Sequence, residues 1–228
     1  MSDYNFVIDN ENVMLQDKLQ EYLVDTTQAS IAVGYFFISG FAEIMEYLKK
    51  MEDSSDPDHM MRLLISPTTN RRTAEAMLAG NETYEETKSK SKISNPKENS
   101  KEKAKDEVKK TLEYMPQKEK ELLAVKKLID LIHKKKLQIK VYTKEQLHAK
   151  AYIFDLDVKH LKRVAIVGSS NLSISGIKQH TELNIITLHE KDAQEVKEWF
   201  NRHWDDESST EFTEDIADIL EKSWAGKE

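Results

Sequence analysis

The sequence predicts an α/β protein with a mixed, largely parallel sheet sandwiched by helices. Short apolar runs with the length of strands alternate with segments whose apolar residues recur at helical spacing. This alternation is typical of a layered domain in which helices cover a sheet. No internal repeat is visible along the 228 residues, so one sheet with its helices accounts for the whole pattern.

Each element follows from a local pattern. Leu15, Leu19 and Leu23 share one face of a first helix, and Ser66-Pro67 ends a strand rich in Leu and Ile. The run LQIKVY at 137–142 alternates in the manner of a half-buried strand. In chain order we expect helices over 13–24, 41–48, 118–135, 192–204 and 212–224, and strands over 30–36, 60–65, 137–142, 147–154, 163–167 and 182–188.

Residues 81–106 differ from the rest of the chain because they hold almost nothing that a core could bury. They are expected to form a charged insertion, either mobile or a solvated helix, that the chemistry does not need. The remainder of 1–205 is expected to be one domain, and 206–228 a C-terminal helix at a junction to a missing downstream region.

Composition limits the class of protein. Apolar residues make up 39% of the chain, which is enough for a core, and no cysteine is present to form a disulfide or a thiolate metal site. The first twelve residues lack the pattern of a signal peptide, and no apolar stretch has the length of a membrane span. A cytoplasmic protein without a membrane partner is therefore expected.

The charge is unevenly distributed. The net charge of −7 argues weakly against a nucleic-acid partner. However, residues 126–150 hold eight lysines and two acids, whereas 182–228 hold fourteen acids and five bases. A local basic surface could still attract an anionic partner. The run at 133–136 (HKKK) is more typical of a solvated helix end, where cations favour the helix dipole.

The chemically informative region begins at His148. In the expected strand LHAKAYIF, side chains alternate between faces, so His148 and Lys150 project from one face, two residues apart. The next strand ends in Gly168-Ser169-Ser170-Asn171, where glycine permits a sharp turn and the polar side chains offer hydrogen-bond donors. Glu182 then supplies a carboxylate. A nucleophile or acid, a cation, neutral donors and an orienting acid suit phosphoryl chemistry.

These residues resemble the signature of the phospholipase D superfamily: His148-x-Lys150, Asp155, then Gly168-Ser169-x-Asn171. Glu182 falls where small nucleases of that superfamily place a glutamate. The spacing between Asp155 and Gly168 is longer than in the family pattern, so 156–162 is expected to be a lengthened hairpin turn. Asp155 is expected to be structural or turn-forming rather than catalytic.

The flanks of the chain carry a further resemblance. The opening residues 6–23 and 29–41, and the ending 199–225, resemble the phospholipase D-like domain at the head of some bacterial Swi/Snf-type helicases. This resemblance implies a covalently linked helicase motor in the full-length protein. The chain itself holds no GxxxxGK[ST] motif and so carries no such motor.

The superfamily resemblance implies a metal-independent phosphodiesterase without a cofactor, most directly a DNA nuclease. His148 would form a phosphohistidine, and Glu182 would orient an imidazole. Lys150, Ser169 and Asn171 would hold the non-bridging oxygens, with Gly168 and Ser170 also contacting the substrate. The superfamily uses two copies of the motif, and of the seven histidines only His148 has the motif context. The resemblance therefore implies a homodimer with one shared site.

Two alternatives remain open. The chain could be a catalytically inactive module that binds DNA or targets a helicase to it, because a fold can persist after its chemistry is lost. It could also be a lipid phosphodiesterase, but the sequence shows no amphipathic basic helix to support membrane binding. DNA is expected as the partner ahead of RNA.

Overall fold

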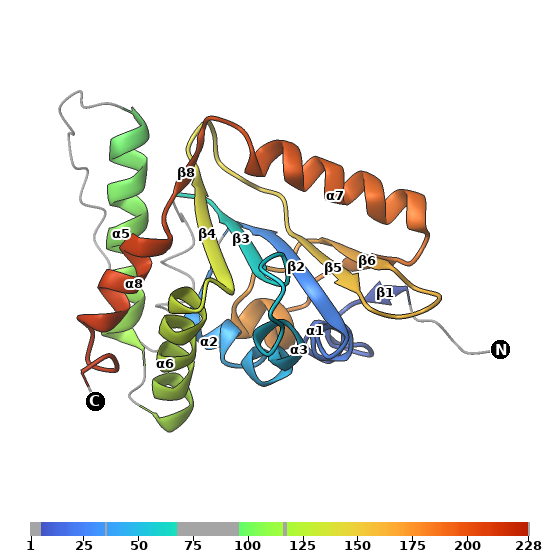
Figure 1. The fold of residues 1–228 in the computed structure, drawn as a ribbon, viewed down its shortest axis with the longest axis horizontal. Helices are drawn as coiled ribbons and strands as arrows, with labels where there is room; N and C mark the ends of the chain where they lie inside the picture. Colours follow the sequence, from blue (N-terminus) through green and yellow to red (C-terminus); the bar gives the residue numbers. More distant parts are fainter. Residues whose placement is uncertain (1–5, 35, 68–95, 116–117, 228) are drawn as a thin grey trace.

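The computed structural model describes residues 6–34, 36–67, 96–115 and 118–227, and they form one eight-stranded mixed sheet covered by helices (Figure 1). The strand order across the sheet is β1-β7-β6-β5-β2-β3-β4-β8. The strands are β1 (Val7–Ile8), β2 (Thr26–Val33), β3 (Met61–Ile65), β4 (Leu137–Tyr142), β5 (Ala151–Leu156), β6 (Arg163–Gly168), β7 (Asn184–Thr187) and β8 (Ser209–Glu211).

The expected α/β class with a mixed sheet between helices is confirmed. Parallel pairing lies at the centre, between β2 and β3 and between β3 and β4. The outer strands pair antiparallel, including the β5–β6 hairpin whose turn spans 157–162. The short edge strands β1 and β8 were not expected from the sequence, because two or three residues are too few to show a periodic pattern.

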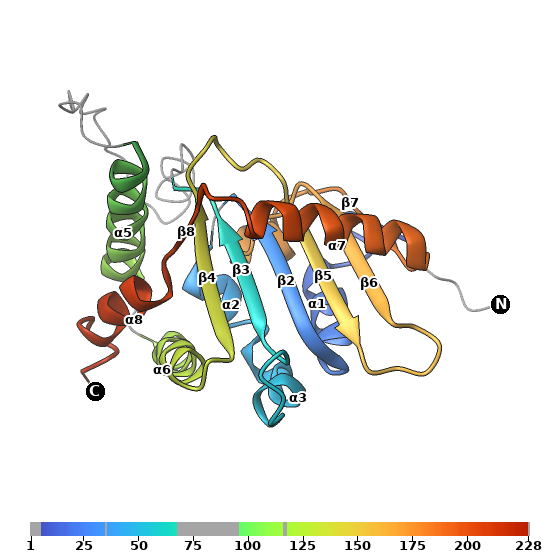
Figure 2. The ribbon, with the colours of Figure 1, turned by 45° about the horizontal axis from the view of Figure 1, so that its top comes forward.

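Helices cover the two faces unequally. One face packs against the larger core, to which α1, α2, α6 and α8 contribute, whereas α7 crosses the strands on the other face (Figure 2). The helices are α1 (Leu15–Leu23), α2 (Ile38–Phe41), η1 (Met45–Tyr47), α3 (Lys49–Glu52), α5 (Pro96–Tyr114), α6 (Glu119–His133), η2 (Ser175–Gln179), α7 (Glu190–Trp204) and α8 (Thr213–Glu221).

The single helix expected over 41–48 is wrong. The chain instead forms the short α2 and η1, because the hydrogen bonds donated by Glu43 and Ile44, and then by Tyr47 and Leu48, reach three residues back rather than four. The backbone at Gly40 also packs so closely on Leu172 that a β-carbon there would lie 2.6 Å from its carbonyl carbon. Phe41, Ile44 and Leu48 are nevertheless fully buried, as the apolar pattern predicted.

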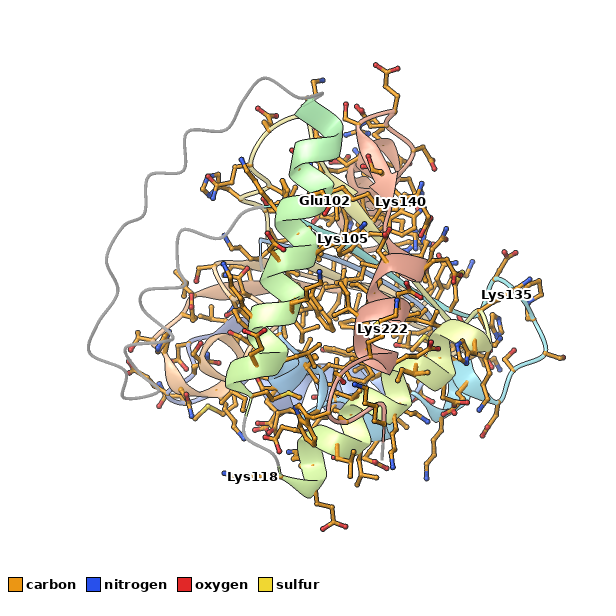
Figure 3. All side chains as sticks on the ribbon, turned by 90° about the vertical axis from the view of Figure 1, so that its left-hand side faces the viewer. Glu102, Lys105, Lys118, Lys135, Lys140 and Lys222 are labelled. Atoms are coloured by element: carbon orange, nitrogen blue, oxygen red, sulfur yellow. The ribbon has the colours of Figure 1, made fainter. Side chains whose placement is uncertain are left out.

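The charged segment 81–106 lies partly outside the described residues. From Pro96 onward it belongs to α5, which buries Ala104 and Leu112 against the main core. Lys105 on α5 pairs with Asp215 on α8 at 2.9 Å, and Figure 3 shows Glu102 and Lys105 on the side of α5 that faces α8. The described part of the segment is therefore a helix that packs on the domain.

Beneath α7 lies a polar cluster formed by Gln28, Ser30, Arg62, Asp155 and Lys197. Pairing between strands sets Gln28 opposite Asp155 and Ser30 opposite Arg62. Lys197 reaches down from α7 and donates to Ser30 Oγ at 2.9 Å and to Asp155 Oδ2 at 2.7 Å. Polar bonds as well as apolar packing therefore attach α7 to the sheet.

The protonation of Lys197 should make stability depend on pH. Burial lowers the pKa of Lys197 from 10.5 to about 8, with Asp155 opposing the shift. Above about pH 8 the unfolded chain holds a proton that the folded chain releases, so the free energy of unfolding rises with pH. A shift of this size corresponds to about 3 kcal/mol. Burial also raises the pKa of Tyr152, which opposes the gain above about pH 10.

Urea unfolding of the wild type and of Lys197→Met checks this prediction. The difference between their free energies of unfolding should grow in favour of the wild type from about pH 8 to pH 10. Lys222→Met is the control, because Lys222 forms an exposed pair with Asp218 and should give a difference that stays constant. Parallel curves for the wild type and Lys197→Met would contradict the prediction.

Candidate active site

The candidate residues gather at one edge of the sheet, where β2, β3, β4 and β6 end and where β5 and β7 begin. The strand directions impose this arrangement, because β5 and β7 run antiparallel to their neighbours. The loops that carry His148, Ser169 and Glu182 all leave the sheet at this edge. Ligand sites of open α/β sheets lie outside the carboxyl ends of the parallel strands, and the candidate residues lie at that edge.

His148 and Lys150 lie just before β5 rather than within it. The strand expected over 147–154 begins only at Ala151, because regular pairing with Ala32 of β2 starts there. The alternation nevertheless continues upstream, since Leu147 and Ala149 pack among the apolar residues between the sheet and α7. The side chain of His148 is exposed to solvent.

Lys150 is attached to both neighbouring segments. Its Nζ donates to the carbonyl oxygen of His148 at 2.7 Å, and its own carbonyl accepts from the Gly168 N–H at 3.1 Å. The first bond places a cation beside the backbone of the histidine. The second ties the His-x-Lys segment to the Gly-Ser turn at the end of β6.

Ser169 and Glu182 form the polar pair of the site. The Ser169 hydroxyl donates to Glu182 Oε2 and also accepts from the Leu183 N–H at 3.1 Å. The Ser169 N–H donates to the Leu183 carbonyl at 3.2 Å. These hydrogen bonds fix the position of the serine oxygen. Because the serine is exposed, the oxygen is also accessible from solvent.

Gly168 permits this arrangement. A β-carbon at Gly168 would lie 2.3 Å from the Leu183 carbonyl oxygen and 2.6 Å from Asn184 Cα, well inside van der Waals contact. Strand β7 can therefore approach the end of β6 closely only because residue 168 has no side chain. The role expected for Gly168 was substrate contact, and the structure adds this packing requirement.

Ser170 faces inward and is fully buried. Its N–H donates to Asn184 Oδ1 at 3.3 Å, and the Asn184 amide donates to Ser170 Oγ at 2.9 Å. The buried Tyr152 hydroxyl donates to the Ser170 carbonyl at 2.9 Å. Burial first, and then the negative charge of Glu182, raise the pKa of Tyr152, so it stays a neutral donor. Ser170 therefore stabilises the turn after β6 from its buried side.

Asn171 is also buried, with 3% of its surface exposed. A β-carbon on Gly34 would lie 3.3 Å from Asn171 Oδ1 and 3.3 Å from the Leu147 carbonyl oxygen. The amide thus lies close to the end of β2 and to the residue that precedes His148. This position favours a role in holding the His148 segment.

Asp155 lies away from this edge, five residues along β5 from Lys150. Its carboxylate accepts from Arg163 Nε and from Lys197 within the cluster beneath α7. The structure therefore places it among residues that attach α7 to the sheet and not beside Ser169.

The residues that hold the site loops were not expected from the sequence. Asn184 and Tyr152 brace Ser170, and Asn10 donates to the carbonyls of Gly176 and His180 at 2.9 and 3.1 Å. The sequence does carry a signal for Asn184. In the alternating run ELNIITL this residue falls on the side of the strand that faces the core, where an apolar residue is expected. Asn10 adopts a φ of 58°, a conformation that asparagine tolerates well.

The lysines of 126–136 do not form a basic surface at the site. Lys127 and Lys134 both pair with Glu52, and Lys136 donates to the carbonyls of Asp56 and His59. These contacts lie at the opposite edge, where β3 and β4 begin. This part of the basic run 126–150 therefore lies away from the candidate site, whereas Lys144 and Lys150 belong to the loop at the site edge.

Two further features concern metals and membranes. Among the described residues, no group of three or more histidine or acidic side chains is arranged to hold a metal ion. Within the same part of the chain, none of the helices combines the length and apolar character needed to cross a membrane.

Several solved structures are similar to this chain. The phospholipase D family member Nuc from Salmonella typhimurium has 10% sequence identity and a TM-score of 0.47, with coverage of 86% of this chain and 89% of its own. NucT from Helicobacter pylori has 11% identity and a TM-score of 0.44, with coverage of 90% and 97%. The archaeal chromatin protein TrmBL2, described as showing a novel mode of DNA binding, has 12% identity and a TM-score of 0.43, with coverage of 92% and 55%.

No curated protein matches the chain. A family model does match, and it is described as "Cardiolipin synthase, PLD-like domain". The match spans residues 23–204, which include β2 to α7 and every candidate site residue. The chain therefore belongs to the phospholipase D-like family, within a superfamily of phosphodiesterases.

Proposed function

We propose that this protein is a metal-independent phosphodiesterase, and specifically a DNA nuclease, that acts through a phosphohistidine in a site shared by two copies of the chain. One observation carries the proposal: the Ser169–Glu182 pair and the His148-x-Lys150 segment meet at one solvent-exposed edge, joined through the Gly168–Lys150 hydrogen bond. The family match supports the reaction class. The helicase motor implied by the flanks, and a cytoplasmic location, stay predictions.

The reaction would have two steps. In the first, an imidazole nitrogen of His148 attacks phosphorus while the bond to the leaving oxygen breaks, and a second imidazole donates a proton to that oxygen. In the second, water attacks the phosphohistidine, its proton passes to the second imidazole, and His148 is released. Each step inverts phosphorus, and no electron acceptor is required.

The charge balance favours two copies of the chain. One ammonium about 4 Å from a phosphate contributes roughly 4 kcal/mol at an effective dielectric near 20. The described site edge supplies one such motif cation, Lys150, and one motif imidazole, His148. A second copy would add the partner subunit's Lys150 and the partner subunit's His148, which completes both the acid and the charge stabilisation.

Glu182 would orient an imidazole in this scheme. Its Oε2 accepts a hydrogen bond from the Ser169 hydroxyl, so a negative charge orients the serine oxygen. A carboxylate has two oxygens, so the other can accept an imidazole N–H and fix its tautomer. We infer that the imidazole is the partner subunit's His148.

Exposure of the site favours a polymer as substrate. His148 and Ser169 are both open to solvent, so an internal phosphodiester can reach them without threading a chain end through the protein. Because the lysines of 126–136 lie at the far edge, few cations assist DNA binding. Cleavage should therefore depend less steeply on salt than it does for proteins with many phosphate contacts.

Replacing His148 tests the nucleophile. His148→Ala should lower DNA cleavage in EDTA by at least about 10³-fold, because covalent catalysis is lost. His160→Ala is the matched control, since His160 is exposed in the β5–β6 turn and should retain wild-type activity. Cleavage of a labelled duplex and of a labelled single strand should be measured. The wild-type protein should also acquire phosphate label through an acid-labile bond.

The same assay separates the alternatives. Wild-type cleavage that disappears in EDTA, or that survives His148→Ala, would refute the mechanism. DNA binding that is unchanged by His148→Ala, with no cleavage by either protein, would favour a non-catalytic DNA-binding module instead.

Replacing Glu182 tests the orienting carboxylate. Glu182→Gln keeps the size of the side chain but removes its charge, so kcat should fall by about 10²-fold, within the range of general acid–base effects. Glu145→Gln, in the exposed loop before His148, is the control and should keep the wild-type kcat. An unchanged kcat for Glu182→Gln would contradict the assignment.

A further inference from the structure

The segment 172–181 joins two parts of the candidate site, and we call it the η2 loop. It follows Asn171 in the turn after β6, and Glu182 comes directly after it. The backbone of η2 packs on that turn, since a β-carbon at Gly176 would lie 2.4 Å from the Asn171 carbonyl oxygen. The position of Glu182 therefore depends on how the η2 loop is held.

The wide turn of η2 uses a donor from outside the loop. In an α-helix the His180 N–H would bind the carbonyl of Gly176, four residues earlier. In η2 it binds the carbonyl of Ser175, five residues earlier, at 2.8 Å. The carbonyl of Gly176 accepts instead from Asn10 Nδ2 at 2.9 Å, in a buried contact. An unpaired buried carbonyl is costly, so the side chain of Asn10 replaces the missing N–H.

The same amide reaches the end of the loop. Asn10 Nδ2 also donates to the His180 carbonyl at 3.1 Å, two residues before Glu182. Its Oδ1 accepts the N–H of Leu15, the first residue of α1, at 2.9 Å. Only one orientation of the amide satisfies the two carbonyls and the N–H together. Asn10 thus connects the η2 loop to α1 through both of its polar side-chain atoms.

The backbone that carries Asn10 is itself fixed. Strand β1 pairs antiparallel with β7, so the residues after β1 lie beside the residues before β7, which include Glu182. The Asp9 carboxylate accepts the N–H groups of residues 11–13 at distances between 2.8 and 3.1 Å. Asn10 itself has a φ of 58°, which asparagine adopts more readily than most residues. The amide is therefore presented to the loop by an ordered turn.

We infer that Asn10 is a positioning residue of the candidate site, which holds the η2 loop so that the Glu182 carboxylate meets the Ser169 hydroxyl. The family match begins at residue 23, so Asn10 lies outside the matched residues. The catalytic consequence rests on the proposed function, in which Glu182 orients an imidazole. A displacement of about 1 Å at a catalytic group can cost about 10²-fold in rate, so a loosened η2 loop would lower kcat.

Asn10→Asp tests this role. The substitution retains an acceptor for Leu15 and a residue type that tolerates positive φ, but it sets a carboxylate oxygen against the two carbonyls. With labelled DNA in EDTA, kcat should fall by at least about 10-fold, whereas KM should stay within about 3-fold because Lys150 keeps its contacts. Asn12→Ala is the matched control and should keep the wild-type kcat, since Asn12 is exposed in the same turn and its amide binds Asp9.

A double variant separates positioning from a general loss of structure. If Asn10 acts through Glu182, adding Asn10→Asp to Glu182→Gln should change kcat by less than about 2-fold, because the carboxylate to be positioned is already gone. Losses that multiply would overturn the inference, as would an unchanged kcat for Asn10→Asp. Asn10→Gly accepts the same φ and removes the amide, so it should behave in the same way and decides the question if Asn10→Asp does not fold.

Hydrogen exchange gives a readout that does not depend on catalysis. The backbone amides of residues 176–183 should exchange at least about 10-fold faster in Asn10→Asp than in the wild type, while those of β3 keep their rates. Asn12→Ala should exchange as the wild type does. Unchanged exchange in the η2 loop of Asn10→Asp overturns the inference. Faster exchange there, in a protein whose wild type cleaves no phosphodiester, overturns the proposed function and leaves the placement of the loop by Asn10 intact.

Discussion

The site depends on the close approach of β6 and β7 at Gly168. Because residue 168 has no side chain, the backbone of Leu183 can exchange hydrogen bonds with Ser169, and this contact sets the Ser169 hydroxyl against Glu182. The Gly168 N–H also binds the Lys150 carbonyl, so the same turn fixes the His-x-Lys segment. One glycine therefore aligns residues that are more than thirty positions apart in the chain.

Much of this arrangement could be predicted from the sequence, because strands and polar turn residues leave local signals. The alternation through Leu147 and Ala149, the core face of α1 and the strand β4 follow from periodicity alone. The supports of the site could not be predicted in the same way. Asn184, Tyr152 and Asn10 act on residues distant in sequence, and only the folded chain brings them together.

Charge is the property in which the sequence is least informative about the site. A count along 126–150 suggests a basic surface, but the fold binds Lys127 and Lys134 to Glu52, and Lys136 to backbone carbonyls, at the far edge. Their role is to attach α6 and the loop before β3. The cation of the site is instead Lys150, whose ammonium lies against the carbonyl of His148. Each chain thus brings one motif cation to this edge, and in the proposed function a second copy would supply the other.

The polar cluster beneath α7 has a consequence for how the family can diverge. Lys197 binds groups from two different strands, and Asp155 is its only anionic partner among the described contacts. Loss of Asp155 leaves Lys197 without an anion in a poorly hydrated space, and loss of Lys197 leaves Asp155 with Arg163 as its remaining cation. Loss of both charges can be accommodated by apolar residues of similar volume. Positions 155 and 197 should therefore vary together among relatives, as a linked pair that is inherited or replaced as a unit.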